Sequence, residues 1–179
     1  MNALKALLFP TRVQMQRTLS TPRVLSTPRN LNDFSQFKIN SNKSYRQALG
    51  EMNAGRKSSH WIWYIFPQLA LHGRSEKAIY FGIRSLEEAR LYLDDPTLGP
   101  RLIEISNVAL TWLQGDGKTI RELMGSEIDA YKLLSCATLF YYASLETEHN
   151  SLFEELKSRC QNKLGRTDAD TEQFCQQTS

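Results

Sequence analysis

The sequence predicts an all-α fold, in which a disordered leader precedes a single multihelical domain of about six or seven helices. Three observations support this prediction. Ser or Thr followed three residues later by Glu, Gln or Asp, a helix-start pattern, recurs along the chain. Apolar residues behind these patterns are spaced three and four positions apart. No segment alternates apolar and polar residues between hairpin turns, as the strands of a half-buried sheet would.

Residues 1–32 form the predicted leader, and residues 33–179 form the predicted helical domain. The leader has five basic residues and no acidic one, so the chain's net charge of +3 divides into +5 for the leader and −2 for the domain. Its Arg, Ser, Thr and Leu content is typical of a mitochondrial transit peptide. Within it, residues 19–23 and 25–29 repeat LSTPR, whose prolines exclude a continuous helix. We therefore expect mitochondrial localisation; the alternative is a disordered tail on a cytoplasmic protein.

The first predicted helix of the domain covers residues 45–54. Ser44 and Gln47 form a capping-box pattern in front of it, and Gly55 offers a stop. The apolar run 61–66 has no such signals, and it fits either a buried strand or a buried helical turn. A further helix is expected to start at residues 73–75, Gly-Arg-Ser.

The remaining helices are each predicted from a start signal, an apolar face or a stop signal. Pro100 falls in a first helical turn, where its missing N–H costs little. The predicted ranges are about 86–94, 100–114, 130–143 and 150–164, with a short helix after Asp170; the expected capping residues are Ser85, Thr119 and Ser126.

Composition excludes several classes of protein. The longest uninterrupted apolar run, 61–66, is far shorter than the ~20 residues of a membrane-spanning helix. Three cysteines without CxxC spacing argue against a disulfide framework, and neither they nor the three histidines supply the paired spacing of a zinc site. The cations of the domain form no continuous run and its charge is negative. We therefore expect no membrane insertion, no metal site and no nucleic-acid partner.

The most unusual segment is 55–68, GRKSSHWIWYIFPQ, which gathers cations, a histidine, aromatic rings and an amide shortly before Arg74 and Ser75. These residue types can bind an anionic ligand that contains a ring. Aromatic faces stack on such a ring, and Arg grips phosphate or carboxylate with two parallel hydrogen bonds. The alternative is structural, with the tryptophans in the core and His60 hydrogen-bonded to a buried carbonyl.

Five runs stand out by their length and order: residues 55–68, GRS at 73–75, SLEEAR at 85–90, LGPRL at 98–102 and DAYKLLSCATLF at 129–140. Together they resemble the family catalogued as domain of unknown function 1810, over about residues 34–174. The resemblance implies a mainly helical fold and brings no established reaction. The positions that the family pattern marks are Gly55, Lys57, His60, Trp61, Trp63, Phe66, Pro67, Gln68, Gly73, Ser75, Arg101, Asp129, Lys132, Ser135, Thr138 and Phe140.

Two departures from the family pattern bear on a site. Asn40-Ser41 stands where an Ala-Gln pair is expected after Phe37, and Leu71-His72 stands where Gly-Leu is usual. An N-terminal contribution to the site is therefore not implied by the resemblance.

The matched polar residues would have complementary roles if they converge. His60 is the candidate proton shuttle, because imidazole changes charge near neutral pH, and Asp129 would orient it or act as a base. The candidate ligand-binding residues, which supply cations, stacking rings and hydrogen-bonding groups, are Lys57, Trp61, Trp63, Gln68, Arg74, Ser75, Arg101 and Lys132. A structural alternative holds for Asp129, which follows the Ser126 cap by three residues, with Lys132 as its i+3 neighbour.

Two classes of function follow from the sequence. In the first, the domain binds or processes a small anionic metabolite, nucleotide-derived ones included, in a pocket lined by His, Trp and Arg; no cofactor is indicated. In the second, it is a non-catalytic protein-interaction module with an aromatic surface. Burial of His60 and Trp63 in a cleft would favour the first function, and an exposed flat aromatic patch would favour the second.

Overall fold

The computed structural model describes residues 34–115 and 117–178. The predictions for residues 1–32, namely a disordered leader, a transit peptide and the LSTPR repeat, lie outside the described residues. The all-α prediction is confirmed, since the described residues form helices and no strand. The α-helices are α1 (Ser35–Asn53), α2 (Ile62–Ile65), α3 (Glu76–Tyr80), α4 (Leu86–Asp94), α5 (Leu98–Gln114), α6 (Ile120–Met124), α7 (Glu127–Ala143), α8 (Asn150–Leu164) and α9 (Ala169–Thr178); η1 (Ala70–His72) is a 3₁₀ helix.

The described part of the chain has nine α-helices where about six or seven are predicted. The extra elements are short: α2 has four residues and α6 has five. The ambiguous run 61–66 contains α2, so it forms a buried helical turn and not a strand. Segments this short show too little periodicity to be separated from loops in the sequence.

Helix α1 begins at Ser35, ten residues before its predicted start. Ser44 is therefore no cap; its hydroxyl accepts a hydrogen bond from the Tyr64 hydroxyl at 3.1 Å. In the part of α1 that precedes the predicted start, residues 35–44, the buried side chains are Phe37 and the polar Ser41. Because Ser41 interrupts the apolar stripe, the sequence pattern conceals the first turns of this helix.

The predicted caps of three other helices are confirmed. The side chains of Ser85, Thr119 and Ser126 each accept a hydrogen bond from the backbone N–H three residues later. Thr119 also forms the full reciprocal capping box with Glu122. Gly125 ends α6 in the left-handed conformation.

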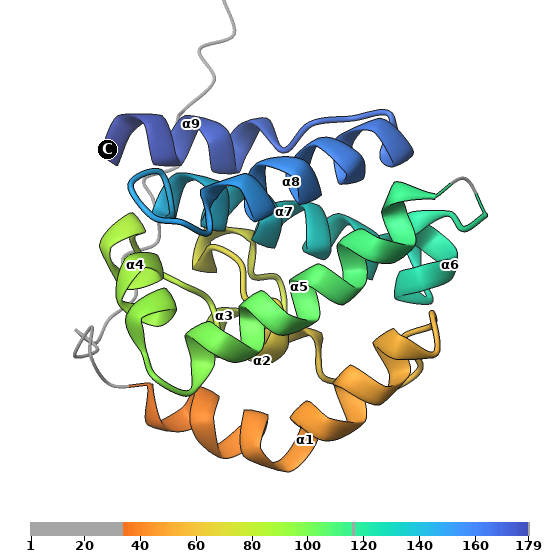
Figure 1. Ribbon diagram of the computed structural model, residues 1–179. Coiled ribbons are helices and arrows are strands. Elements are labelled where there is room, and N and C mark those ends of the chain that lie inside the picture. The colour runs from red at the N-terminus through yellow and green to blue at the C-terminus, as the bar shows by residue number, and fades with distance from the viewer. Residues whose placement is uncertain (1–33, 116, 179) are drawn as a thin grey trace, which may run out of the picture.

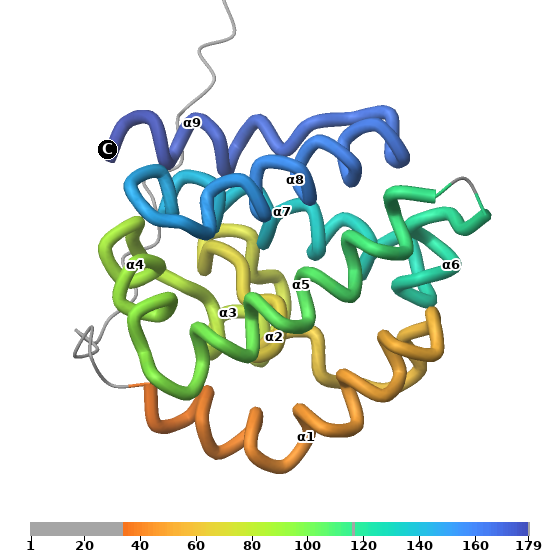
Figure 2. Tube along the Cα trace, in the orientation of Figure 1, coloured from red at the N-terminus to blue at the C-terminus, as the bar shows by residue number. Residues whose placement is uncertain are grey.

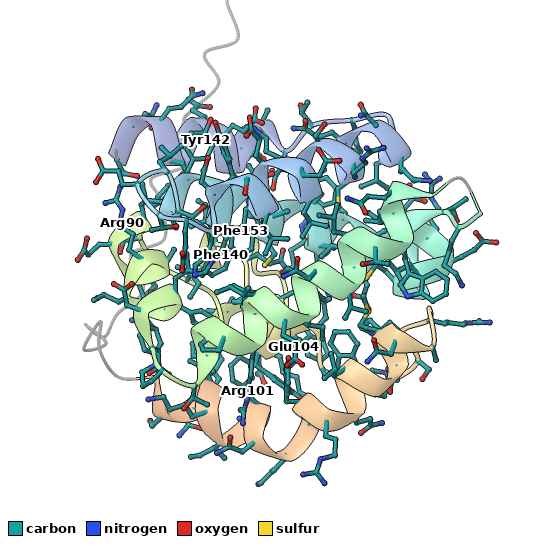
Figure 3. The ribbon with its side chains drawn as sticks, viewed as in Figure 1. Arg90, Arg101, Glu104, Phe140, Tyr142 and Phe153 are labelled. Atoms are coloured by element: carbon teal, nitrogen blue, oxygen red, sulfur yellow. The ribbon has the colours of Figure 1, made fainter. Side chains whose placement is uncertain are left out.

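Helix α7 lies at the centre of the domain. It contacts α4, α6, α8 and α9, and its side chains are buried on more than one face, as expected for a helix that is apolar nearly all round. The rings of Phe140 and Phe153 lie 5.7 Å apart where α7 packs against α8 (Figure 3). In Figure 1, α5 crosses the front of the molecule, while α1 and α9 lie at opposite edges. Figure 2 follows the chain from the α1 edge to α8 and then to α9 at the opposite edge.

One short backbone pairing positions the segment after α2. Leu69 and Ile83 form an isolated parallel bridge, in which Ile83 N donates to Gln68 O at 2.8 Å and Ala70 N donates to Ile83 O at 2.7 Å. A Cβ at Gly82 would lie 2.4 Å from the Cα of Ala70, so the close approach of the two segments requires glycine there. None of the described helices combines the length and apolar character needed to cross a membrane.

Candidate functional site

The loop 55–61, which carries the first half of the unusual segment, is organised by Glu51 of α1. The Glu51 carboxylate accepts hydrogen bonds from Ser58 N at 2.8 Å, Ser59 N at 3.0 Å and Trp61 Nε1 at 2.8 Å, and also from the Ser59 hydroxyl. Partial burial acts to raise the pKa of Glu51, but these hydrogen bonds outweigh it and lower the pKa from 4.5 to about 2. Glu51 is thus an ionised acceptor that fixes the conformation of the loop.

A pocket of about 330 Å³ lies between α2, η1, α3 and α7. Its volume is near the lower end of the roughly 300–1,000 Å³ of small-molecule sites, which suits a small ligand. The lining residues are Trp63, Gln68, Leu69, His72, Gly73, Arg74, Ser75, Ala78, Phe81, Gly82, Ile128 and Lys132. The Leu69–Ile83 bridge holds together the two segments that form one side of it.

Cations gather around the half-buried Trp63 ring at this pocket. The ammonium groups of Lys77 and Lys132 each lie 5.1 Å from the centre of that ring. Such cation–π contacts hold a positive charge beside an apolar wall. Arg74 is exposed on the same pocket and has no ion-pair partner among the described residues.

Lys132 also belongs to an ion-pair network that is centred on Asp129. Asp129 pairs through Oδ2 with Lys57 Nζ at 2.6 Å and through Oδ1 with Lys132 Nζ at 3.1 Å. Lys57 also donates to Ser59 O at 2.7 Å, and its ammonium lies 5.2 Å from the centre of the Trp61 ring. One carboxylate therefore faces two ammonium groups, which leaves positive charge in excess at the pocket.

The structure brings together five of the predicted site residues in the lining of one pocket: Trp63, Gln68, Arg74, Ser75 and Lys132. Ser75 also caps α3, where its hydroxyl accepts from Ala78 N at 3.3 Å. Asp129 and Lys57 do not line the pocket but are joined to Lys132 by the ion pairs. The i+3 pairing of Lys132 with Asp129 is the one that their spacing predicts.

Three predicted site residues lie elsewhere. Trp61 is 1% exposed and belongs to the core, where its indole N–H is bonded to Glu51. His60 is exposed, and no hydrogen bond or ion pair joins its side chain to Asp129 within residues 34–115 and 117–178. Arg101 joins α5 to α1: it donates to Ser41 Oγ at 2.8 Å, and its guanidinium lies 5.1 Å from the centre of the Tyr45 ring. Figure 3 shows Arg101 and Glu104 on the part of α5 that faces α1.

Sequence reasoning missed three residues that the structure places at or beside the site. His72 lines the pocket, Lys77 contacts the Trp63 ring, and Glu51 fixes the loop. His72 is noticeable in the sequence as a departure from the family pattern. Its Nε2 lies 2.8 Å from the Thr171 hydroxyl and 3.9 Å from Asp168 Oδ1. Because these residues lie far along the chain from His72, local spacing gives no signal for the contacts.

The remaining reactive side chains form no centre of their own. Cys136, Cys160 and Cys175 are buried and form no disulfide with one another. Burial raises the pKa of the Cys175 thiol to about 12, so this thiol is protonated near neutral pH. Among residues 34–115 and 117–178, no three His, Cys, Asp or Glu side chains are grouped so that they could hold a metal ion.

The fold and the site define an all-α domain with a cation-rich pocket beside its central helix. The chain belongs to the family described as "Protein of unknown function (DUF1810)", whose model matches residues 30–174. It is similar to the crystal structure of the conserved hypothetical protein Rv1873 from Mycobacterium tuberculosis, with 38% sequence identity and a TM-score of 0.68. That match covers 79% of this chain and 95% of the other. No curated protein gives a significant match.

Proposed function

We propose that the pocket between α2, η1, α3 and α7 binds a small anionic metabolite, nucleotide-derived compounds among them. One observation carries the proposal. Arg74 and Lys132 line a small, partly apolar pocket, Lys77 contacts the Trp63 ring that also lines it, and the nearby Asp129 already pairs with two lysines. A phosphate or carboxylate group would complement the excess positive charge through charge-assisted hydrogen bonds.

The rest of the pocket suits the non-ionic part of such a ligand. Trp63, Leu69 and Phe81 supply apolar surface, and Gln68 supplies an amide that can donate and accept. Because two ammonium groups lie near the Trp63 ring, the main contribution of this ring to anion binding is to position those cations.

A second pocket with basic residues is a weaker candidate for anion binding. It is lined by Arg56, Lys118 and Arg121 among others. Lys118 Nζ donates to Gly55 O at 2.8 Å, and Arg121 pairs with Glu127 at 3.0 Å. Two of its three cations therefore already have acceptors, whereas Arg74 has no ion-pair partner among the described residues.

The test is a binding screen by calorimetry with inorganic phosphate, AMP and related nucleoside monophosphates. Arg74→Gln should weaken binding of any anionic hit by about tenfold to a hundredfold, because a hydrogen bond to a charged group contributes about 1.5–3 kcal/mol. Arg46→Gln removes an equally exposed cation from α1 and should leave the affinity unchanged. The proposal is wrong if no anion binds, or if both variants bind a hit as tightly as the wild type.

One observation favours the second candidate function, a protein-interaction surface. Ile128 is 71% exposed at the pocket, and Leu71, which is 54% exposed, directly precedes His72. Large apolar side chains exposed beside a pocket are typical of interaction surfaces. A Leu71→Ser variant should lose a protein partner in co-purification and still bind small anions, because Leu71 does not line the pocket. Equal recovery of every partner with both proteins would count against this function.

A further inference from the structure

His72 is held at the pocket by a buried polar pair from the other end of the chain. It ends η1, and its Nε2 lies 2.8 Å from the Thr171 hydroxyl at the start of α9. Thr171 and the neighbouring Asp168 are both fully buried. The Thr171 hydroxyl in turn lies 2.7 Å from Asp168 Oδ2. The imidazole is therefore fixed at one ring nitrogen, beside a pocket that also contains Arg74 and Lys132.

The direction of these hydrogen bonds follows from the number of protons that each group has. A carboxylate only accepts, and Asp168 already accepts from the Tyr131 hydroxyl at 3.3 Å and from Thr171 N at 3.3 Å. Thr171 has a single hydroxyl hydrogen, which its short contact with Asp168 uses. The Thr171 oxygen is then an acceptor toward His72, so the hydrogen-bond network assigns the proton of the neutral imidazole to Nε2.

The second ring nitrogen, Nδ1, makes no hydrogen bond to any residue of the described part of the chain. In the Nε2–H form of imidazole, Nδ1 carries a lone pair and accepts a hydrogen bond. We propose, building on the proposed function, that Nδ1 of His72 accepts a hydrogen bond from a hydroxyl or N–H group of the ligand. The pocket would then take an anion with such a donor group, its charge beside Arg74 and Lys132 and its donor at His72.

This role differs from a purely structural one. A structural histidine would need only its Nε2–H bond to Thr171, whereas the proposal assigns a separate function to Nδ1. His72→Phe keeps an aromatic ring at this position and removes both ring nitrogens, so neither the donor nor the acceptor remains. Thr171→Val removes the hydroxyl that accepts from Nε2–H and leaves Asp168 Oδ1, 3.9 Å from Nε2, as a more distant oxygen. Thr171→Ser keeps the hydroxyl with a small change in packing. The pair of Thr171 variants separates loss of the hydrogen bond from loss of stability.

The first measurement is the ¹⁵N NMR spectrum of His72 at a pH where the ring is neutral. The wild type and Thr171→Ser should show a protonated Nε2 and an unprotonated Nδ1, and Thr171→Val should show a mixture of the two forms. A protonated Nδ1 in the wild type would overturn the assignment, and so would a spectrum that Thr171→Val leaves unchanged.

The second measurement titrates the full chain with sn-glycerol 3-phosphate and n-propyl phosphate, which differ in their two hydroxyl groups. The wild type should prefer the hydroxylated phosphate by about three- to tenfold, since a neutral hydrogen bond contributes about 0.5–1.5 kcal/mol. His72→Phe should bind both equally, and His60→Ala should behave as the wild type. Equal wild-type affinities would overturn the role of His72 and leave the proposed function standing. Binding of neither phosphate, together with no binding of any anion in the nucleotide screen, would overturn both.

Discussion

Glu51 shows how one carboxylate can fix a loop rich in functional residue types. Two backbone N–H groups, the Ser59 hydroxyl and the Trp61 indole all donate to it. In the sequence it is one more acidic residue on an amphipathic helix, because its partners lie seven to ten residues ahead in a loop of unknown path. Hydrogen-bonding roles of this kind depend on loop conformation, which propensities and periodicity do not supply.

Replacing Glu51 with Gln should destabilise the protein by about 1–3 kcal/mol near neutral pH, because three N–H groups, including the indole N–H of the buried Trp61, lose a charged acceptor. The folded-state pKa is about 2, below the ordinary 4.5. The extra stability of the wild type is therefore complete above about pH 4.5 and is lost as the pH falls through about 2. Urea denaturation of both proteins between pH 2 and 7 measures the difference.

Glu146→Gln, which changes an exposed carboxylate, is the control for this measurement and should show no such pH-dependent difference. A constant gap between Glu51→Gln and the wild type down to pH 2 would contradict the role assigned to the ionised carboxylate.

The candidate site was predictable as a set of residue types and less so as a set of positions. Lys132 and Asp129 are neighbours on one helix, so their pairing follows from spacing. Arg101 is a cation in the first turn of a helix, and the sequence could not tell a pocket from the α1–α5 contact that it makes with Ser41. His60 and His72 are twelve residues apart, and only the path of the chain through α2 and η1 decides which one reaches the pocket.

At the scale of the elements, the turn between α6 and α7 contacts the loop that carries Lys57. Gly125 has a φ of +73°, and a Cβ there would lie 2.5 Å from the carbonyl oxygen of Lys57. Lys57 N also donates to Leu123 O at 2.7 Å, so this turn holds the backbone of the residue whose ammonium pairs with Asp129. A side chain at position 125 would therefore displace the Lys57 backbone and disturb the ion pair of Lys57 with Asp129.

Gly125→Ala should lower the free energy of unfolding by more than Gly165→Ala does. Both positions require the left-handed conformation, which costs a non-glycine residue about 1–2 kcal/mol, but a Cβ at Gly165 meets no atom within 4 Å. The additional collision with the Lys57 carbonyl should make the Gly125 variant worse by at least ~1 kcal/mol. Urea denaturation of the two variants gives the comparison, and equal losses would show that the turn relaxes freely.

Helix boundaries were predictable where side chains mark them and not where burial alone does. Ser85, Thr119 and Ser126 cap their helices as their spacing predicts, since each satisfies a backbone N–H that the helix leaves free. Helix α1 has no side-chain cap, and its first buried polar residue, Ser41, is held by Arg101 of α5. Its start is thus set by tertiary contacts, which a local pattern cannot reveal.

The predicted leader and the predicted helical domain have net charges of opposite sign. Residues 1–32 carry a charge of +5, and residues 33–179 carry −2. Within the domain, cations contact separate partners: Lys57 and Lys132 pair with Asp129, Lys118 donates to the Gly55 carbonyl, and Arg101 donates to Ser41 of α1. Such dispersed cations can form a pocket for one anion, whereas a polyanion needs a continuous basic surface.

We propose that the cationic segment directs the chain to mitochondria, because a basic, acid-free segment responds to the import receptor and to the membrane potential. A fluorescent protein carrying residues 1–32 should enter mitochondria, and one carrying residues 34–179 should stay outside. Replacing the five basic residues of the segment, Lys5, Arg12, Arg17, Arg23 and Arg29, with Gln keeps its length and removes its charge, so import should be lost. Import of the Gln variant would show that charge is not the signal, and exclusion of the unaltered fusion would overturn the targeting proposal itself.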